Sequence, residues 1–324
     1  MVLIKNSHYY SISFEGGARV YFTGLDDDGD LENPTLDRND ITPAVAFGTG
    51  FFISKDGMIA TNSHVASQKI DKAKARSSIM NYFNYIANEG SKSINDINEK
   101  LGILQIAIMS TDSPSDLYEY RQMYAALVEE RDNTQDIVNM LRSINGMDYE
   151  VVAHNDIGVA YNNSYVTNMS DFKGCVTVAD DPTHDLAIIQ LKDKITPEGK
   201  KVFKLPKGRS KTDERKASDD VSKKKDVKVG KTLYMIGYNL GPTLAITDQG
   251  VKAQVTSGEV SQDTDDASIM YTIPALHGSS GSPIIDEYGK LVAVNFAGLD
   301  NTQGFNYGVK VAHLRKLMES LISE

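Results

Sequence analysis

The chain is poor in cysteine and in long apolar runs. Of its 324 residues one is cysteine, Cys175, and none is tryptophan. A single cysteine excludes intrachain disulfides, which many secreted proteins use, and so favours a reducing compartment. Cys175 lies in a segment that is typical of a strand, and we expect a small packing residue there rather than a reactive thiol. No apolar run approaches the roughly 18 residues of a membrane span, so we expect no membrane partner.

Positive charge is also scarce, since the formal net charge is −10. Nucleic-acid binding needs a basic surface, and we therefore expect no nucleic-acid partner. Lysines do cluster between Lys207 and Lys228, but acidic residues alternate with them. This pattern predicts a solvated, charged linker over residues 196–226. The first residues, Met1–His8, lack the apolar core and cleavage site of a secretory signal. Either the protein is cytoplasmic or a leader has been removed, and the single cysteine leads us to expect a cytoplasmic protein.

The segment His277–Pro283 is the most informative one that is present. It places Ser280 between two glycines, directly before an apolar β-run. A chain that bends this sharply exposes the serine hydroxyl and turns successive N–H groups toward one point. An acyl-transfer enzyme needs that arrangement to hold a developing oxyanion.

Two upstream segments contain the other residue types of a hydrolytic site. Gly48–Val65 predicts a hairpin whose second strand ends at His64. Asp180–Leu191 places acidic residues at the start of a strongly apolar strand, where burial can fix a carboxylate against an imidazole. A hydroxyl is a poor nucleophile unless a base lies within hydrogen-bond reach, and a histidine oriented by a carboxylate is such a base.

The chain resembles the trypsin-like serine peptidases of the PA clan, closest to the HtrA (Deg) type. The resemblance rests on Gly48–Val65, Asp181–Leu191, Val229–Gly237, Thr256–Ser261 and Gly278–Pro283. It implies two six-stranded antiparallel β-barrels of the chymotrypsin type. Helical apolar spacing adds a helical insertion and a C-terminal helix, so the expected fold class is mainly β with an α insertion. HtrA-type enzymes usually continue into a PDZ module, and none fits this chain.

The resemblance also implies the domain boundaries. The first barrel is expected over residues 1–66 and 147–195, and the second over residues 227–310. The helical insertion is expected over residues 67–146. The tail, residues 311–324, repeats apolar residues at helical spacing and predicts the C-terminal helix.

By the same resemblance, Ser280 is the nucleophile, His64 the general base and Asp185 the residue that orients the imidazole. Asp180, Asp181 and Asp156 compete with Asp185 for that role. The N–H groups of Gly278 and Ser280 form the oxyanion hole. No Cys/His spacing indicates a metal site, and we expect neither a metal nor an organic cofactor.

Further positions are assigned to substrate binding. They are Leu276, His277, Asn295, Phe296 and Ala297. No acidic residue stands at the expected base of the specificity pocket, which favours a neutral P1 residue. Ser279 and Ser282 depart from the common pattern. Ser279 cannot form the ion pair with a newly cut amino terminus that an aspartate forms there, so activation by amino-terminal cleavage is not expected.

The insertion between His64 and Asp185 is the main departure from a compact barrel. Its apolar spacing predicts one helix that Gly90 closes, a second over Ile94–Ile108, and a third that begins at Ser113-Pro114. Two interpretations stay open for it. It is either a self-packed helical decoration, or a sensor that docks an activating protein partner.

The sequence thus predicts a cytoplasmic serine endopeptidase that cleaves a protein or peptide substrate through an acyl-enzyme, regulated through the insertion. A catalytically silent barrel pair that serves as a protein-binding scaffold is the alternative. An esterase acting at the same site is a third hypothesis.

Overall fold

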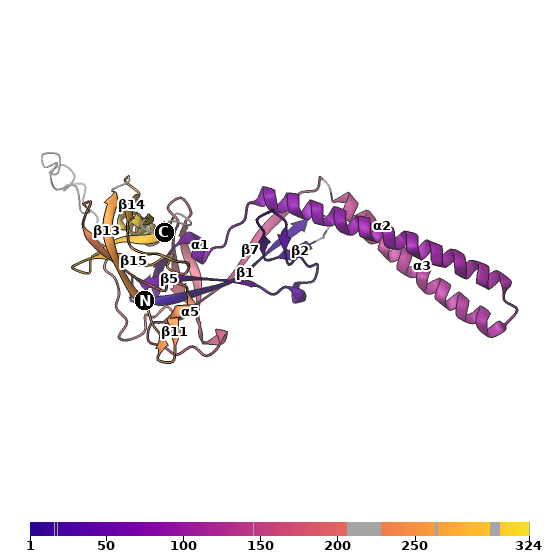
Figure 1. Cartoon of the computed structure of the whole chain (residues 1–324), viewed down its shortest axis with the longest axis horizontal. Helices are drawn as coiled ribbons and strands as arrows, with labels where there is room; N and C mark the ends of the chain where they lie inside the picture. Colours follow the sequence, from indigo (N-terminus) through magenta and orange to yellow (C-terminus); the bar gives the residue numbers. More distant parts are fainter. Residues whose placement is uncertain are drawn as a thin grey trace. The chain divides into compact units, whose positions relative to one another are not determined.

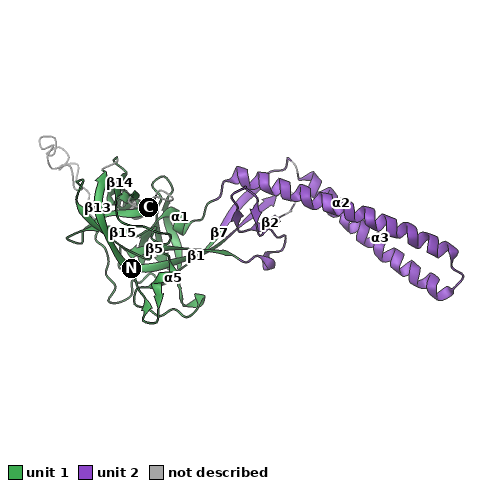
Figure 2. Cartoon of the chain, in the orientation of Figure 1, with its two compact units in different colours: residues 1–8, 43–69, 154–324 green, residues 9–42, 70–153 purple. Residues whose placement is uncertain are grey.

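The computed structural model describes residues 1–15, 17, 19–144, 146–205, 228–262, 265–298 and 305–323. Most of the predicted charged linker, residues 206–226, lies outside them. Two compact units are present (Figure 2): unit 1 contains residues 1–8, 43–69 and 154–324, and unit 2 contains residues 9–42 and 70–153. Strands β1 (Val2–Phe14) and β7 (Tyr149–Tyr161), which are labelled in Figure 1, each contribute residues to both units. No helix in the described part of the chain is long and apolar enough to cross a membrane.

The first barrel is closed by pairing of its first and last strands. Its strand order is β1-β5-β6-β9-β8-β7, and β7 pairs back onto β1. The further strands are β5 (Ala44–Phe52), β6 (Met58–Thr61), β8 (Lys173–Asp181) and β9 (Leu186–Leu191). The pairs β1–β5, β5–β6, β6–β9, β8–β9 and β7–β8 are antiparallel. A seventh strand, β2 (Arg19–Phe22), extends the sheet beyond β1.

The second barrel lies wholly in unit 1 and is also closed. Its order is β10-β13-β14-β17-β16-β15. The strands are β10 (Thr232–Gly237), β13 (Gln254–Gln262), β14 (Ser268–Tyr271), β15 (Pro283–Asp286), β16 (Leu291–Gly298) and β17 (Asn306–Lys310). The predicted fold class of two six-stranded antiparallel barrels is confirmed.

The burial of strand β9 on both faces explains why its sequence is apolar without alternation. All six of its residues are buried. Ala187, Ile189 and Leu191 pack into the interior of the first barrel. Leu186 and Ile188 face the other way, into a core that contains Leu291, Val294 and Val309 of the second barrel. Because side chains alternate across a strand, a strand that is buried on both faces needs apolar residues at nearly every position.

Unit 2 combines strands with a helical hairpin. Its helices are α2 (Lys72–Ser110) and α3 (Pro114–Ser143). Ala75, Ile79, Phe83 and Ala87 recur at every fourth position of α2, so they form one stripe. That stripe packs against β-strand residues from Tyr10 to Phe22 and against the last turns of α3. Residues 9–42, which the sequence analysis placed in the first barrel, therefore cluster with the helices, because their apolar side chains are covered there.

The helical insertion is confirmed, but its expected first break is wrong. Helix α2 continues through Gly90 instead of ending there. A Cβ at Gly90 would lie 2.7 Å from Cγ2 of Val138 on α3. The glycine thus permits the two helices to approach closely, and it does not terminate a helix. The N-cap predicted at Ser113, with Pro114 in the first turn, is confirmed, and the Ser113 side chain accepts from Asp116 N.

Short elements complete the structure. Helix α1 (Ser63–Ala66) carries His64, which therefore lies in a helical turn and not at a strand end. The C-terminal helix α6 (Val311–Ser323) is confirmed and packs on the core between the barrels. The others are β3 (Gly24–Leu25), β4 (Leu31–Glu32), η1 (Arg38–Asp40), η2 (Met169–Asp171), α5 (Pro242–Ala245), β11 (Ile246–Thr247) and β12 (Gly250–Val251).

Candidate active site

The loop before β15 bends at two glycines that cannot be replaced without steric conflict. Gly278 and Gly281 have φ angles of 90° and 85°, in the left-handed region. A Cβ at Gly278 would lie 2.5 Å from Gly241 N, and one at Gly281 would lie 2.1 Å from Thr49 O. Ser282, which departs from the common pattern, fits because Gly237 beside it has no side chain: a Cβ there would lie 1.9 Å from Ser282 Oγ.

The backbone N–H groups of this loop fall into two sets. Ser279 N donates to Leu276 O at 2.9 Å, Gly281 N to Asn295 O at 2.8 Å, and Ser282 N to Ser279 O at 3.0 Å. By contrast, within the described part of the chain the N–H groups of Gly278 and Ser280 donate to no protein acceptor. These are the two donors that the sequence analysis assigned to the oxyanion hole.

Contacts around the loop fix its peptide planes. His277 O accepts from Leu240 N at 2.6 Å. Since the carbonyl and the N–H of a trans peptide point in opposite directions, this bond directs the Gly278 N–H away from Leu240 N. Thr49 Oγ1 donates to Gly278 O at 2.8 Å, and Thr49 N donates to Ser280 O at 2.8 Å. The loop is therefore held from both barrels.

His64 is oriented by Asp185. The imidazole Nδ1 lies 2.7 Å from Asp185 Oδ2, and the His64 backbone N–H donates to Asp185 Oδ1 at 2.9 Å. Both carboxylate oxygens thus bind the same histidine. A carboxylate acceptor at Nδ1 keeps the proton on that nitrogen and leaves Nε2 as the basic atom.

Asp185 itself has an unusual backbone conformation. Its φ is 50°, in a region that non-glycine residues seldom occupy. Asn62 Nδ2 donates to its carbonyl oxygen at 2.8 Å. Two of the competing acids pair with other side chains. Asp180 pairs with Lys69, and Asp181 pairs with His184. Of the four candidate carboxylates, Asp185 is the one hydrogen-bonded to His64.

A cavity of about 500 Å³ joins the predicted catalytic residues. His64 and Ser280 both line it, together with His277 and Gly278. Its remaining lining is largely apolar and comes from both barrels: Ala46, Phe47, Val65, Gln68, Leu240, Gly241, Pro242 and Thr243. Ligand pockets of this size are usual in enzymes.

The predicted substrate-binding residues differ in their surroundings. Leu276 and His277 are exposed, and Phe296 is half-buried. Asn295 is 2% exposed, its Nδ2 donates to Ser279 O, and its backbone groups bind Gly281 and Ser282. Asn295 thus braces the nucleophile loop and offers no free backbone group to a substrate strand. Ala297 belongs to β16, and its side chain lies outside what the structure describes.

Sequence reasoning missed the supporting residues Thr49, Asn62 and Gln68. Thr49 stands inside the quoted Gly48–Val65 segment, but its hydroxyl contacts residues almost 200 positions away or more. Gln68 lies just beyond α1, and its Nε2 donates to His64 O at 2.7 Å. A short polar side chain between two glycines is a weak signal, and only the folded chain shows these contacts.

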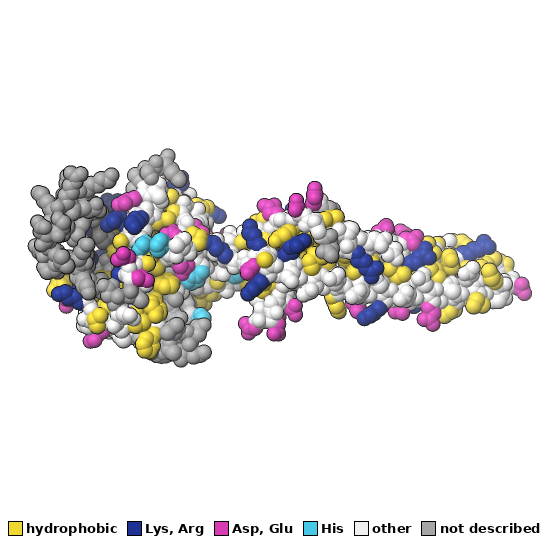
Figure 3. Space-filling model, turned by 90° about the horizontal axis from the view of Figure 1, so that it is seen from above, with side chains coloured by type: hydrophobic (Ala, Val, Ile, Leu, Met, Phe, Trp, Pro, Cys, Tyr) yellow, Lys and Arg dark blue, Asp and Glu magenta, His cyan; other side chains and the backbone are white. Residues whose placement is uncertain are grey.

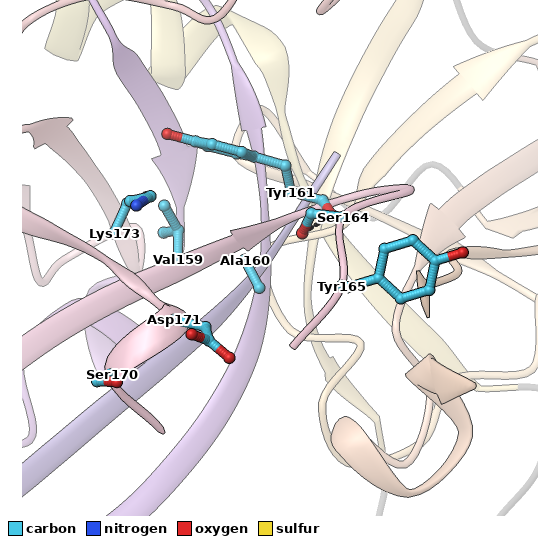
Figure 4. A pocket seen from close by; sticks show the side chains of 8 residues that line it. All are labelled: Val159, Ala160, Tyr161, Ser164, Tyr165, Ser170, Asp171 and Lys173. Carbon is cyan, nitrogen blue, oxygen red and sulfur yellow. Dashed lines mark hydrogen bonds between the residues drawn. The ribbon is translucent and has the colours of Figure 1, made fainter. Parts of the chain in front are cut away.

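A second cavity, of about 230 Å³, lies against the first barrel (Figure 4). Tyr161 and Tyr165 extend in opposite directions there, so their hydroxyls do not converge. Asp171 accepts from Thr167 and Asn168, and these hydrogen bonds lower the pKa of its carboxyl group. The Asp171 carboxylate is thus engaged in the loop, and Lys173 is the other charged residue that lines this cavity. The described residues do not include a group of three or more His, Cys, Asp or Glu arranged to hold a metal ion.

Comparison with known proteins decides the type of domain. Residues 148–294 match the family model of the trypsin-like peptidase domain, a stretch that includes Asp185 and Ser280. Residues 148–294 are thus similar to a trypsin-like peptidase domain. No curated protein matches the sequence. Among solved structures, the serine endoprotease from Yersinia pestis is similar over 99% of this chain, with 14% identity and a TM-score of 0.45. This chain spans 63% of the length of that structure.

In a trypsin-like peptidase domain an imidazole, a carboxylate and a hydroxyl act as one unit. Here the imidazole and the carboxylate are in contact, and Ser280 lines the same cavity as His64. The family match begins at residue 148, so His64 and the helical hairpin lie outside it.

Proposed function

We propose that the protein is a serine endopeptidase that cleaves peptide bonds through an acyl-enzyme. The observation that carries the proposal is the placement of His64: Asp185 holds its ring at 2.7 Å, and the histidine lines one cavity with Ser280. Ser280 Oγ attacks the carbonyl carbon while His64 Nε2 takes the hydroxyl proton. The C–N bond then breaks and His64 returns that proton to the leaving amine. Water hydrolyses the ester by the same steps in reverse roles.

The unoccupied donors of the loop support a resting enzyme that is competent without amino-terminal cleavage. The Gly278 and Ser280 N–H groups are available to an oxyanion, and each such donor contributes about 2.7–4 kcal/mol to transition-state stabilisation. Ser279 replaces the usual ion pair with neutral hydrogen bonds, from its Oγ to Leu276 O at 2.6 Å and from Asn295 Nδ2 to its carbonyl. The loop is thus braced without the positively charged amino terminus that proteolysis creates in other enzymes.

A fluorophosphonate probe tests the proposal directly. The parent protein is expected to be phosphonylated at Ser280, while Ser280→Ala and His64→Ala lose labelling because they lack the nucleophile and the base. Ser143→Ala is the matched control, since it removes an exposed serine hydroxyl at the end of α3, in unit 2 and away from the cavity. An unlabelled parent, or labelling that survives in Ser280→Ala, contradicts the proposal and favours the silent binding scaffold. Hydrolysis of a peptide library then separates an endopeptidase from an esterase.

We further propose that the distal half of the α2–α3 hairpin docks an activating protein partner. No residue from 102 to 137 is buried, although this stretch is rich in apolar side chains. Large exposed ones are Ile103, Ile106, Met109, Tyr118 and Met123; Figure 3 shows apolar side chains along the surface of the hairpin. Between residues 102 and 128 the only charged residues are Asp112, Asp116, Glu119 and Arg121. A helix that is apolar around most of its circumference is normally covered, and the lack of lysine disfavours an anionic membrane as the cover.

The docking proposal is tested with Ile103→Glu/Ile106→Glu. We expect this variant to keep the parent's basal rate of fluorophosphonate labelling, because the changes lie in unit 2. We expect it to lose any stimulation of that rate by cell lysate. Equal stimulation of the parent and the variant, or none of either, contradicts a partner at this surface.

We also propose a cytoplasmic location, which the single cysteine supports and which subcellular fractionation tests.

A further inference from the structure

Helix α1, which carries His64, is too short to provide N–H donors for all of its own carbonyl groups. It is four residues long and has two internal hydrogen bonds at its end, from Ala66 N to Asn62 O and from Ser67 N to Ser63 O. The next two carbonyls, those of His64 and Val65, have no helical donor above them. A helix this short is stable only where other groups satisfy its ends.

Side chains from elsewhere in the chain satisfy those carbonyls. Gln68 Nε2 donates to His64 O at 2.7 Å. Asn6 Nδ2, from β1, donates to Val65 O at 3.0 Å. The Asn6 side chain is 0% exposed, and an amide is costly to bury in a barrel unless its hydrogen bonds are made. Its Oδ1 has no hydrogen-bond partner in the described part of the chain, so the donor end of the amide makes the contacts at this position.

Asn155, on β7, connects the two donors. Its Oδ1 accepts from Asn6 Nδ2 at 2.9 Å and from the Gln68 backbone N–H at 3.1 Å. One acceptor oxygen therefore aligns both residues that hold the His64 helix. Asn6 and Asn155 lie on β1 and β7, which are the two strands that continue from unit 1 into unit 2.

We infer that Asn6 and Asn155 are positioning residues for His64. They act through α1: Asn155 aligns Asn6 and Gln68, and these fix the carbonyls of Val65 and His64. The inference rests on the proposed function, because it concerns the base of that same reaction. It adds that the imidazole is set from two directions, by Asp185 on the ring and by the two asparagines on the backbone.

The test compares the second-order rate constant of fluorophosphonate labelling across variants. Asn155→Ala removes the shared acceptor at an exposed position and is expected to lower the rate about tenfold, since small displacements of a catalytic group are costly. Asn155→Asp keeps an acceptor oxygen for both donors and is expected to restore the rate to within about threefold. Asn6→Ala is expected to lower it further, with thermal unfolding measured alongside because the site is buried.

Asn168→Ala is the matched control. Asn168 is also an exposed asparagine whose Oδ1 accepts a backbone N–H, that of Ser170, and it contacts neither α1 nor the cavity. If Asn155→Ala labels as fast as the parent, or if Asn168→Ala slows labelling equally, the positioning role is overturned while the proposed function stands. If the parent itself is unlabelled, the proposed function fails and the positioning role fails with it. A tenfold loss that Asn155→Asp rescues supports both.

Discussion

Thr49 contributes a single hydroxyl to the candidate site, yet that hydroxyl contacts two segments of the second barrel. Its Oγ1 donates to Gly278 O and accepts from Tyr238 N at 3.0 Å. Its own carbonyl accepts from Thr61 Oγ1 at 2.8 Å. The side chain is 0% exposed. Because no water reaches it, a loss of this hydroxyl leaves a carbonyl and an N–H unpaired.

Thr49→Val is therefore expected to cost about 1–3 kcal/mol of unfolding free energy and to slow fluorophosphonate labelling of Ser280 by more than the unfolded fraction explains. Valine has nearly the shape of threonine, so packing is preserved. Chemical denaturation and labelling kinetics measure the two effects. Thr23→Val serves as control, since Thr23 is 4% exposed and donates to Glu32 O in unit 2. Thr49→Val labelling at the parent's rate rules out a role in holding the loop.

At the scale of elements, α2 contains two glycines with opposite surroundings. A Cβ at Gly90 meets the stiff, branched side chain of Val138, whereas a Cβ at Gly102 meets nothing within 4 Å. Alanine is favoured over glycine in a helix by about 0.8–1 kcal/mol. Gly102→Ala is expected to stabilise the hairpin by about that amount. Gly90→Ala is expected to destabilise it by about 1–2 kcal/mol, because the clash with α3 exceeds the gain in propensity.

Urea denaturation followed by circular dichroism distinguishes the two glycine variants. Opposite signs of the change in unfolding free energy are the expected result. A stabilising Gly90→Ala would mean that α2 and α3 separate at no cost, and so contradicts the close approach.

The segment before Asp185 is tied to helix α6 by a pair of histidines. The His184 and His313 rings stack with centroids 3.9 Å apart, and His184 Nδ1 lies 2.7 Å from Asp181 Oδ2. Burial, followed by the nearby His184, lowers the pKa of His313 below its usual 6.5 despite a bond toward Asp266 O. As pH falls, the unfolded chain thus takes up this proton first. The stabilisation is complete above about pH 6.5 and decreases below it.

His313→Phe is expected to reduce the loss of thermal stability between about pH 7.5 and pH 5.5, by roughly 2 °C in Tm. Phenylalanine keeps a stacking ring and cannot be protonated. A part of the slope is expected to persist, because burial also lowers the pKa of His8. Differential scanning calorimetry at both pH values measures it. An unchanged or steeper slope in the variant shows that His313 titrates as it does in the unfolded chain.

At the scale of the whole molecule, local signals predicted the elements well and their partners less well. The Gly48–Val65 hairpin, the nucleophile loop and the cap at Ser113 each depend on residues close together in sequence. Their local sequence patterns therefore predict them. The order of imidazole, carboxylate and hydroxyl residues gave the candidate site, and the structure places Asp185 against His64. The catalytic roles themselves stay predictions until they are tested.

Long-range packing accounts for what the sequence did not show. Gly90 is a helix breaker by local propensity, but contact with α3 makes it the required residue. The strand segments from Tyr10 to Phe22 alternate like barrel strands, yet their covered face meets α2. Asn295 follows the family pattern of a substrate wall and is instead used internally. In each case a partner far along the chain decides the role.

Cys175 has a practical consequence for work on this molecule. The residue is 5% exposed, and burial raises the pKa of its thiol to about 12, so little thiolate is available to an alkylating dye at neutral pH. The native thiol of the folded chain is therefore expected to react little with a thiol-directed dye. A cysteine placed at an exposed position of the hairpin, such as Met109→Cys, becomes the one site that a maleimide fluorophore labels in the folded protein. Anisotropy of that dye then follows partner docking in real time, without a second substitution to remove the native thiol.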